Sequence, residues 1–141
     1  MSLSLLEDVR TAIVNAIKAK VPTLRTCQSH EGLYDLGELR RVFAAAPAIL
    51  VVCLGASGAQ APRGQVVAEV RWSAFVLTAD AKPATRDAQA LSLVQTLLAL
   101  VPANRWGRAE AQRPSDVRAE NLYTGAVDAL AVSLWSVSWR Q

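Results

Sequence analysis

The sequence predicts an α+β domain in which a mixed or antiparallel sheet of about four to five strands carries two helices on one face. Two long strand-like runs, residues 65–79 and 125–140, lie on either side of a helical segment. An amphipathic helical segment also opens the chain, at residues 4–21. The 141 residues suit one domain of common size, so a single core spanning 1–141 is expected.

The first helix has a defined start and end. Ser4 and Glu7 form a capping box, in which each side chain accepts a hydrogen bond from the backbone N–H of the other residue. Pro22 ends the helix because proline has no N–H to donate to the preceding turn. One face is apolar and is expected to cover a sheet. This face holds Leu6, Val9, Ile13, Ala16 and Ile17.

The next part of the chain predicts two strands. Residues 23–28 alternate polar and apolar side chains, which favours a short exposed strand before a turn at 30–32. Residues 35–45 are expected to form a helical turn or two. The unbroken aliphatic run 48–54 is typical of a strand covered on both faces, so it is placed in the middle of the sheet.

Residues 55–64 are mostly small and include three glycines, which predicts a mobile loop or a hairpin connection. A long strand follows at 65–79, with one face apolar throughout. Its other face begins charged, with Glu69 and Arg71 as an expected solvated ion pair, and ends apolar at Leu77. One end of this strand is therefore expected to be exposed to solvent and the other end to be buried.

The second half of the chain predicts a helix and two strands. Thr85 caps a helix that runs to Pro102, with aliphatic residues on more than half of its circumference. Such a helix is buried on one side by the sheet and on the other by a neighbouring helix or subunit. An arginine-rich connection at 103–116 leads to alternating residues 117–123 and to the last strand, 125–140.

Composition argues against a nucleic-acid-binding groove, a disulfide framework and a membrane-spanning segment. The net charge of +3 is mild and the basic residues are scattered, which favours a solvated surface over a nucleic-acid groove. Cys27 and Cys53 suit neither a disulfide framework nor a metal motif, and are read as small buried hydrophobes. The longest apolar stretch, 42–54, is too short to span a membrane, and no secretory signal is recognised, so the cytoplasm is the expected site of assembly.

No residue pattern indicates catalysis, a metal or a cofactor. His30 is the only histidine and lies in a predicted turn, where a structural role is favoured over a catalytic one. The glycine-containing run 55–58 follows a strand but lacks the lysine of a phosphate-binding loop. The protein is therefore expected not to be an enzyme. A small hydrolase acting on the cell envelope stays an alternative without a residue set.

Three tryptophans lie on predicted strands: Trp72, Trp135 and Trp139. Each can remove on the order of 150–250 Å² from water. Either all three belong to the core, or Trp135 or Trp139 anchors a contact between subunits. Both alternatives stay open at this point.

The order of segments resembles a Mu-type phage small tail protein family, whose layout is similar to that of phage tail terminator proteins. Besides the first helix, the resemblance is carried by residues 22–26, 43–51, 72–76, 86–100 and 125–139. The stretch 103–116 is long and basic and departs from the family pattern, so the family's interface residues are not transferred in detail.

The resemblance implies a virion protein that forms a homo-oligomeric, usually hexameric, ring. This ring caps the tail tube, stops its polymerisation and docks onto head-completion or connector proteins, while DNA passes through its lumen without specific binding. The alternative is a head–tail connector or a baseplate-side adaptor. Apolar surface in excess of what a monomer hides is what a ring-closing contact requires.

Candidate residues for these contacts follow from the same reasoning. The lumen is expected to be acidic or neutral, because each phosphate bound by arginine adds affinity that must be released in transit. Glu69 and Asp80 are the lumen candidates, and the segments 55–64 and 103–116 are expected to meet axial neighbours. The interface candidates are Arg63, Trp72, Phe75, Trp106, Arg108, Arg113, Trp135 and Trp139.

Overall fold

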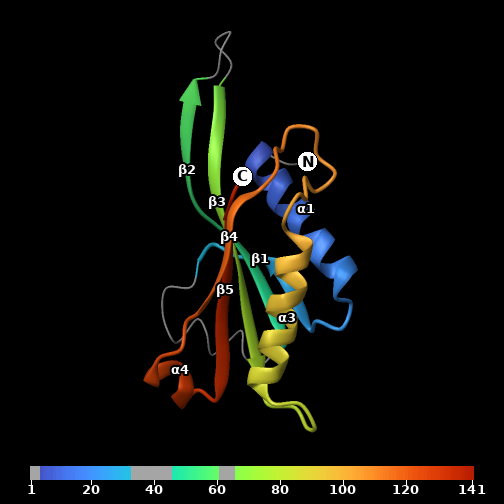
Figure 1. Ribbon diagram of the computed structural model, residues 1–141, viewed down its shortest axis with the longest axis vertical. Helices are drawn as coiled ribbons and strands as arrows, with labels where there is room; N and C mark the ends of the chain where they lie inside the picture. The colour runs from blue at the N-terminus through green and yellow to red at the C-terminus, as the bar shows by residue number, and fades with distance from the viewer. Residues whose placement is uncertain (1–3, 33–45, 61–65) are drawn as a thin grey trace.

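The computed structural model describes residues 4–32, 46–60 and 66–141. Within these residues, a five-stranded mixed sheet carries two long helices on one face, as the sequence predicted, and one short helix at an end, which it did not predict (Figure 1). The helical turns predicted at 35–45 lie outside the described residues. The elements in chain order are α1 (Leu5–Lys20), β1 (Thr26–Ser29), β2 (Ala48–Gln60), β3 (Val66–Ala79), α3 (Arg86–Leu100), β4 (Ser115–Asn121), α4 (Gly125–Ala129) and β5 (Val132–Arg140).

The strands lie in the order β1-β2-β3-β5-β4. Only β1 and β2 are parallel, and every other neighbouring pair is antiparallel. Residues 48–52 at the start of β2 are fully buried, as predicted, but the predicted burial is wrong at Leu54, which is 45% exposed, and β3 rather than β2 is the central strand. The two edges are β1 and β4, whose side chains are mostly exposed.

Both long helices begin at the predicted caps. The Ser4 hydroxyl accepts a hydrogen bond from the Glu7 N–H at 3.1 Å, and the Thr85 hydroxyl accepts one from the Ala88 N–H at 3.1 Å. Asp80 adds a third contact, because its carboxylate accepts a hydrogen bond from the Arg86 N–H at 2.7 Å. These bonds satisfy donors that a helix leaves unpaired in its first turn.

The main core lies between the sheet and the two long helices. β3 and β5 each contribute the side chains of one face to this core, as the alternation of apolar residues along them predicted. Burial of this apolar area is the main source of folding free energy. The largest side chains of this core that are fully buried are Ile13, Ile17, Ile49, Trp72, Leu97 and Trp139.

A smaller core occupies the other face of the sheet near α4. It combines Leu50 and Leu77 from the inner strands with Val127 of α4. The second face of β3 is exposed at Glu69 and buried at Leu77, which confirms that one end of this strand is wet and the other covered.

The predicted loop at 55–64 is wrong for residues 55–60. β2 continues to Gln60 and pairs with β3 down to Val66, after a register shift between Cys53 and Gly55. Small residues disfavour a strand by propensity alone, but backbone pairing with the valine-rich β3 supplies the missing hydrogen bonds. We call residues 54–60 of β2 and 66–71 of β3 the arm. It projects past the rest of the sheet (Figure 1).

The predicted final strand 125–140 is wrong over its first residues. Thr124 accepts a hydrogen bond from the Val127 N–H at 3.0 Å and starts the helix α4. Ala131 then adopts a left-handed φ of 57°, which turns the chain into β5. The alternation predicted for the strand holds from Val132 onward. Local capping therefore overrides the strand pattern at this end.

No helix in the described part of the chain is long and apolar enough to cross a membrane.

Candidate assembly interface

In the described part of the chain, large apolar side chains are exposed at two separate places, apart from Tyr123 near α4. The first place is the first turn of α1 together with the arm, where Leu5, Leu6, Leu54 and Val67 are each 39–47% exposed. The second is the outer side of α3, where Leu91 and Leu98 are 48% and 39% exposed. Leu6 was predicted to lie on the buried face of its helix, but it is 39% exposed, because a hollow separates the first turn of α1 from the arm.

The first place is hollowed into a groove of about 500 Å³. Its walls are the first turns of α1, with Leu6 and Val9, and the arm, with Val67 and Ala68. Residues 110–113 of the connection between α3 and β4, together with Gln141, also line it. We call this hollow the arm groove. It is a concave surface with apolar walls.

The second place is a stripe along α3. The helix packs on the sheet through Ala90, Val94 and Leu97, which are buried. The opposite side faces solvent and carries no charged residue between positions 88 and 101. We call its exposed residues the α3 stripe: Ala88, Leu91, Ser92, Gln95, Leu98 and Ala99. α3 was predicted to be buried on two sides. Within the chain, the sheet buries only one of them.

The tryptophan candidates are mostly used inside the chain. Trp72 and Trp139 are 1% and 2% exposed, so neither ring has area left to offer to a second subunit. This corrects their assignment as interface anchors, and the core alternative holds for both. Trp135 and Phe75 are half-buried, and both pack against core residues.

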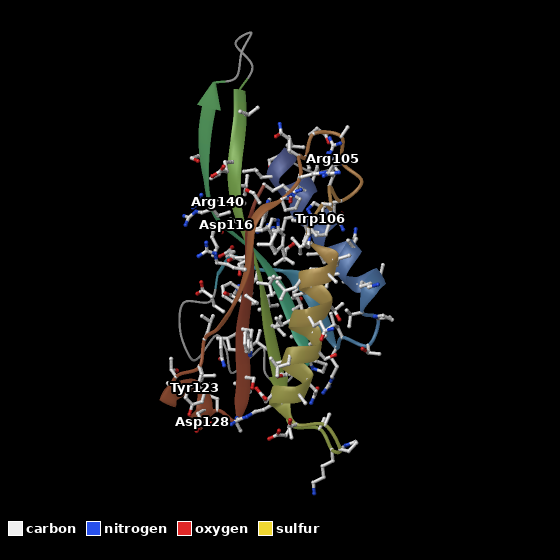
Figure 2. The ribbon with its side chains drawn as sticks, viewed as in Figure 1. Arg105, Trp106, Asp116, Tyr123, Asp128 and Arg140 are labelled. Carbon is white, nitrogen blue, oxygen red and sulfur yellow. The ribbon has the colours of Figure 1, made fainter. Side chains whose placement is uncertain are left out.

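Trp106 is a core residue even though it lies outside the helices and strands. Its ring is 7% exposed and its centroid lies 5.9 Å from that of Trp139. The indole N–H donates to the Gln141 side chain at 2.8 Å. Trp106 is therefore not available as an interface residue, because its ring fills a gap beside the sheet (Figure 2).

The connection at 103–114 is held by internal hydrogen bonds rather than left free. Arg105 donates to the carbonyls of Ala109 and Ala111 at 3.1 and 2.6 Å. Arg108 is half-buried and lies 3.3 Å from Glu110 and 3.8 Å from Asp8. Its contact with Asp8 ties this connection to α1.

The remaining predicted residues in the described part of the chain lie on the surface. Arg113 is exposed beside the arm groove, and Arg63 lies outside the described residues. Glu69 and Asp80 are both exposed, but they stand near opposite ends of β3. Asp80 already caps α3, whereas Glu69 lies 4.0 Å from Arg140.

A row of paired charges crosses β3, β5 and β4 at the base of the arm. Arg140 lies 4.0 Å from Glu69 and 3.9 Å from Asp116 (Figure 2). Arg118 donates a hydrogen bond to Asp116, and this bond, with the charges of both arginines, lowers the pKa of the Asp116 carboxyl. The ion pair predicted between Glu69 and Arg71 is thus replaced by one across strands.

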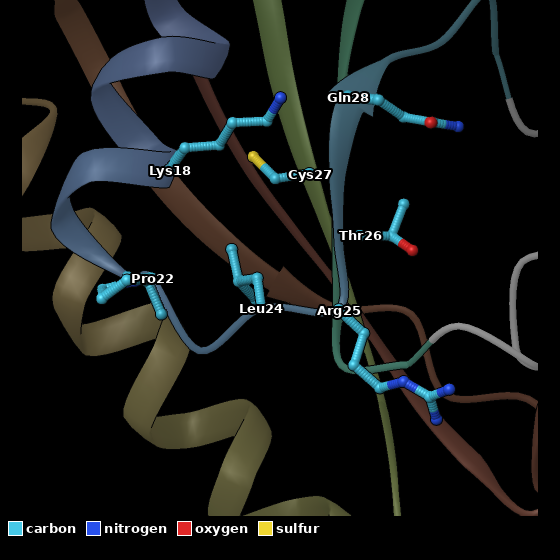
Figure 3. Close-up of a pocket in the computed structure, with 8 residues that line it drawn as sticks. Lys18, Pro22, Leu24, Arg25, Thr26, Cys27 and Gln28 are labelled. Carbon is cyan, nitrogen blue, oxygen red and sulfur yellow. The ribbon is translucent and has the colours of Figure 1, made fainter.

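A second hollow, of about 490 Å³, lies where α1 meets β1. Figure 3 shows Lys18 and Cys27 on the side of β1 that faces the helix, with Thr26 and Gln28 pointing to the other side. Neighbouring strand residues alternate in this way, so the side chains do not converge on one point. Burial raises the pKa of the Cys27 thiol, which keeps it protonated and a poor nucleophile near neutral pH.

The described residues hold no group of three or more His, Cys, Asp or Glu side chains placed to bind a metal ion. His30 closes a local turn, because its ring accepts a hydrogen bond from the Gly32 N–H at 3.0 Å.

Comparisons with known proteins give a structural likeness only. No family model matches the chain, and no curated protein matches it. Eighteen chains of solved structures do match. One belongs to the "Virion of native gene transfer agent (GTA) particle", with 17% identity, a TM-score of 0.48, and coverage of 99% of this chain and 96% of that one. At this identity and TM-score the likeness assigns no role, so function is argued from the surface of the chain itself.

Proposed function

We propose that this protein is a structural component of a phage-like virion, and that its copies close into a hexameric ring that ends the tail tube. The observation that carries the proposal is the pair of separate apolar surfaces, the arm groove and the α3 stripe. A ring needs two unlike patches on each subunit, so that the same contact repeats around the circle. The ring acts as a structural cap and catalyses no reaction.

Termination requires a ring whose two rims differ. The arm lies toward one end of the long axis of this chain and α4 toward the other (Figure 1). The arm, at one end, has mostly small or aliphatic side chains. The other end carries α4, the exposed Tyr123, and an ion pair of 2.8 Å between Arg86 and Asp128 (Figure 2). One rim would complement the last ring of the tube, and the other would dock onto a head-completion protein without admitting a further tube ring.

Passage of DNA favours a lumen that does not grip phosphates. The guanidiniums of Arg118 and Arg140 are each within ion-pair distance of a carboxylate at the base of the arm. Paired charges of this kind add little net attraction for DNA. We infer that Glu69, beside these pairs, lies nearer to the lumen than the arginines of residues 103–116. A ring with an arginine-lined bore would contradict this inference.

The proposal is tested by measuring the mass of the purified protein and its effect on tail tubes. Light scattering is expected to give a closed multiple of the 15.1 kDa chain, and electron microscopy is expected to show rings. Added to tail tube protein during polymerisation, the rings should bind one tube end and stop its growth. A protein that stays monomeric at high concentration and binds no tube would refute the proposal. Labelling of the protein inside a virion would separate a terminator from a connector or a baseplate adaptor by position.

A further inference from the structure

The α3 stripe differs from an ordinary solvent-facing helix surface. Surface helices usually carry charged residues on the side that faces water. The solvent-facing side of α1 can be compared with that of α3. Helix α1 packs on the same face of the sheet and exposes Glu7, Lys18 and Lys20 to solvent. On α3 the exposed charge is confined to Asp87 in the first turn, and the α3 stripe that follows has none. Since both helices cover one face of the same sheet, the difference is not explained by their place in the chain, and it indicates that the α3 stripe is covered in the assembled protein.

The α3 stripe has the shape of a ridge. Leu91 and Leu98 are seven positions apart, so they lie on one side of the helix, separated by about 10 Å along its axis. Ala88, Ser92 and Ala99 border them with small side chains. Small residues beside two leucines let another surface approach the helix closely, with the leucines as projecting knobs.

The arm groove is suited to receive such a ridge. It is concave, about 500 Å³ in volume, and presents Leu6 and Val67 on opposite walls. Its charged lining residues, Glu69, Glu110 and Arg113, include both signs, so a charge-free partner meets no strong net field. Groove and stripe together hold five of the seven large hydrophobic residues that are exposed in the described part of the chain, and the other two are Leu54 and Tyr123.

We propose that the α3 stripe of one copy seats in the arm groove of the next copy, between its arm and the first turns of its α1. This inference deepens the proposed function, because it rests on the ring and names the contact that closes it. The two surfaces are unlike, so the contact is head-to-tail and leaves a free groove and a free stripe at the ends of any open chain of copies. Closure of the ring removes both ends.

Two variants block one surface each. Leu91→Lys with Leu98→Lys places charge on the stripe, and Leu6→Lys with Val67→Lys places charge in the groove. All four side chains are at least 39% exposed, so the fold should tolerate the changes. Thr11→Lys with Asn15→Lys, on the exposed side of α1, is the matched control with the same added charge.

Each blocked variant alone should be monomeric, with association weakened by about a hundredfold or more, while the control assembles like the wild type. Mixing the two blocked variants should give a species of two chains, because the intact stripe of one meets the intact groove of the other. Sedimentation velocity distinguishes these species. As a second readout, chains with Leu98→Cys and chains with Leu6→Cys, both in a Cys53→Ser background, should be joined by a short bifunctional thiol reagent only when mixed.

The possible failures have different meanings. If the groove variant alone still forms dimers that the stripe variant cannot form, the stripe pairs with itself and the inference is overturned. Rings that persist in both blocked variants would leave the proposed function in place but overturn this contact. A two-chain species from the mixture, without rings from the wild type, would support the contact and count against the ring.

Discussion

One side chain, that of Gln141, joins three parts of the structure. Its carbonyl oxygen accepts hydrogen bonds from the indole N–H groups of Trp106 and Trp139, at 2.8 and 3.0 Å. Its amide nitrogen donates to the carbonyls of Asn104 and Gln112, at 2.9 and 2.7 Å. The backbone of Gln141 also pairs with Val70 of β3. The side chain thus ties residues 103–114 to the sheet.

Replacing Gln141 by alanine should lower the free energy of unfolding by about 2–4 kcal/mol, since it leaves two indole donors and two carbonyls without this partner. Urea unfolding followed by tryptophan fluorescence measures the change. Gln112→Ala is the control, because only the main-chain carbonyl of Gln112 takes part and its side chain is exposed. Equal, small effects of both substitutions would show that the hydrogen bonds of the Gln141 side chain do not hold the connection.

Single residues could be predicted from the sequence only where their partners are local. The Ser4 and Thr85 caps were correct because each hydroxyl bonds a backbone group three residues away. The role of Trp106 could not be predicted, because its partners, Trp139 and Gln141, are more than thirty residues distant. A tryptophan in a polar segment was the one available signal, since such a ring is rarely left in water.

At the scale of elements, the start of α3 gives one lumen candidate a structural role. Asp80 accepts a hydrogen bond from the Arg86 N–H, and Thr78, on the adjoining end of β3, donates to the Arg86 carbonyl at 2.7 Å. The end of β3 and the first turn of α3 are therefore linked by side chains. A residue that only lined a lumen would make no such contact.

Asp80→Ala should lower the free energy of unfolding by about 1 kcal/mol, as expected for loss of a helix-capping bond. Glu69→Ala should change it by less than about 0.5 kcal/mol, because its ion pair with Arg140 is exposed and 4.0 Å long. Thermal or urea unfolding of the two variants compares the lumen candidates directly. Loss of stability in Glu69→Ala as large as in Asp80→Ala would argue against this division of roles.

Apart from the short helix α4, the order and type of the described elements followed from apolar periodicity, but the end of β2 and the start of β5 did not. Residues 55–60 lack strand propensity, and pairing with β3 decides their structure. Residues 125–129 continue an apparent strand pattern, yet the Thr124 cap starts a helix. In both places a contact that the pattern does not encode outweighs the local preference of the side chains.

At the scale of the whole molecule, apolar surface is exposed as predicted, but the residues that form it differ from those predicted. Much of the aromatic surface expected at the interface is used in the core, where Trp72, Trp106 and Trp139 are buried. In the described part of the chain, the large apolar side chains that stay exposed, apart from Tyr123 and Leu54, are aliphatic and divided between the arm groove and the α3 stripe. The sequence could indicate that apolar surface is in excess. It could not show which side chains stay exposed, because burial of a strand residue depends on which helix covers the strand.

The composition of the two surfaces predicts how association responds to salt. Burial of uncharged, aliphatic area is not screened by ions, whereas contacts between exposed charges weaken as the Debye length falls from about 14 Å to about 3 Å between about 0.05 M and 1 M salt. The assembly should therefore persist over this range of sodium chloride and strengthen in sulfate, which favours apolar burial. Sedimentation velocity at each salt concentration measures the fraction assembled. Steep dissociation with rising sodium chloride would instead indicate that charged residues such as Arg113 and Glu110 hold the copies together.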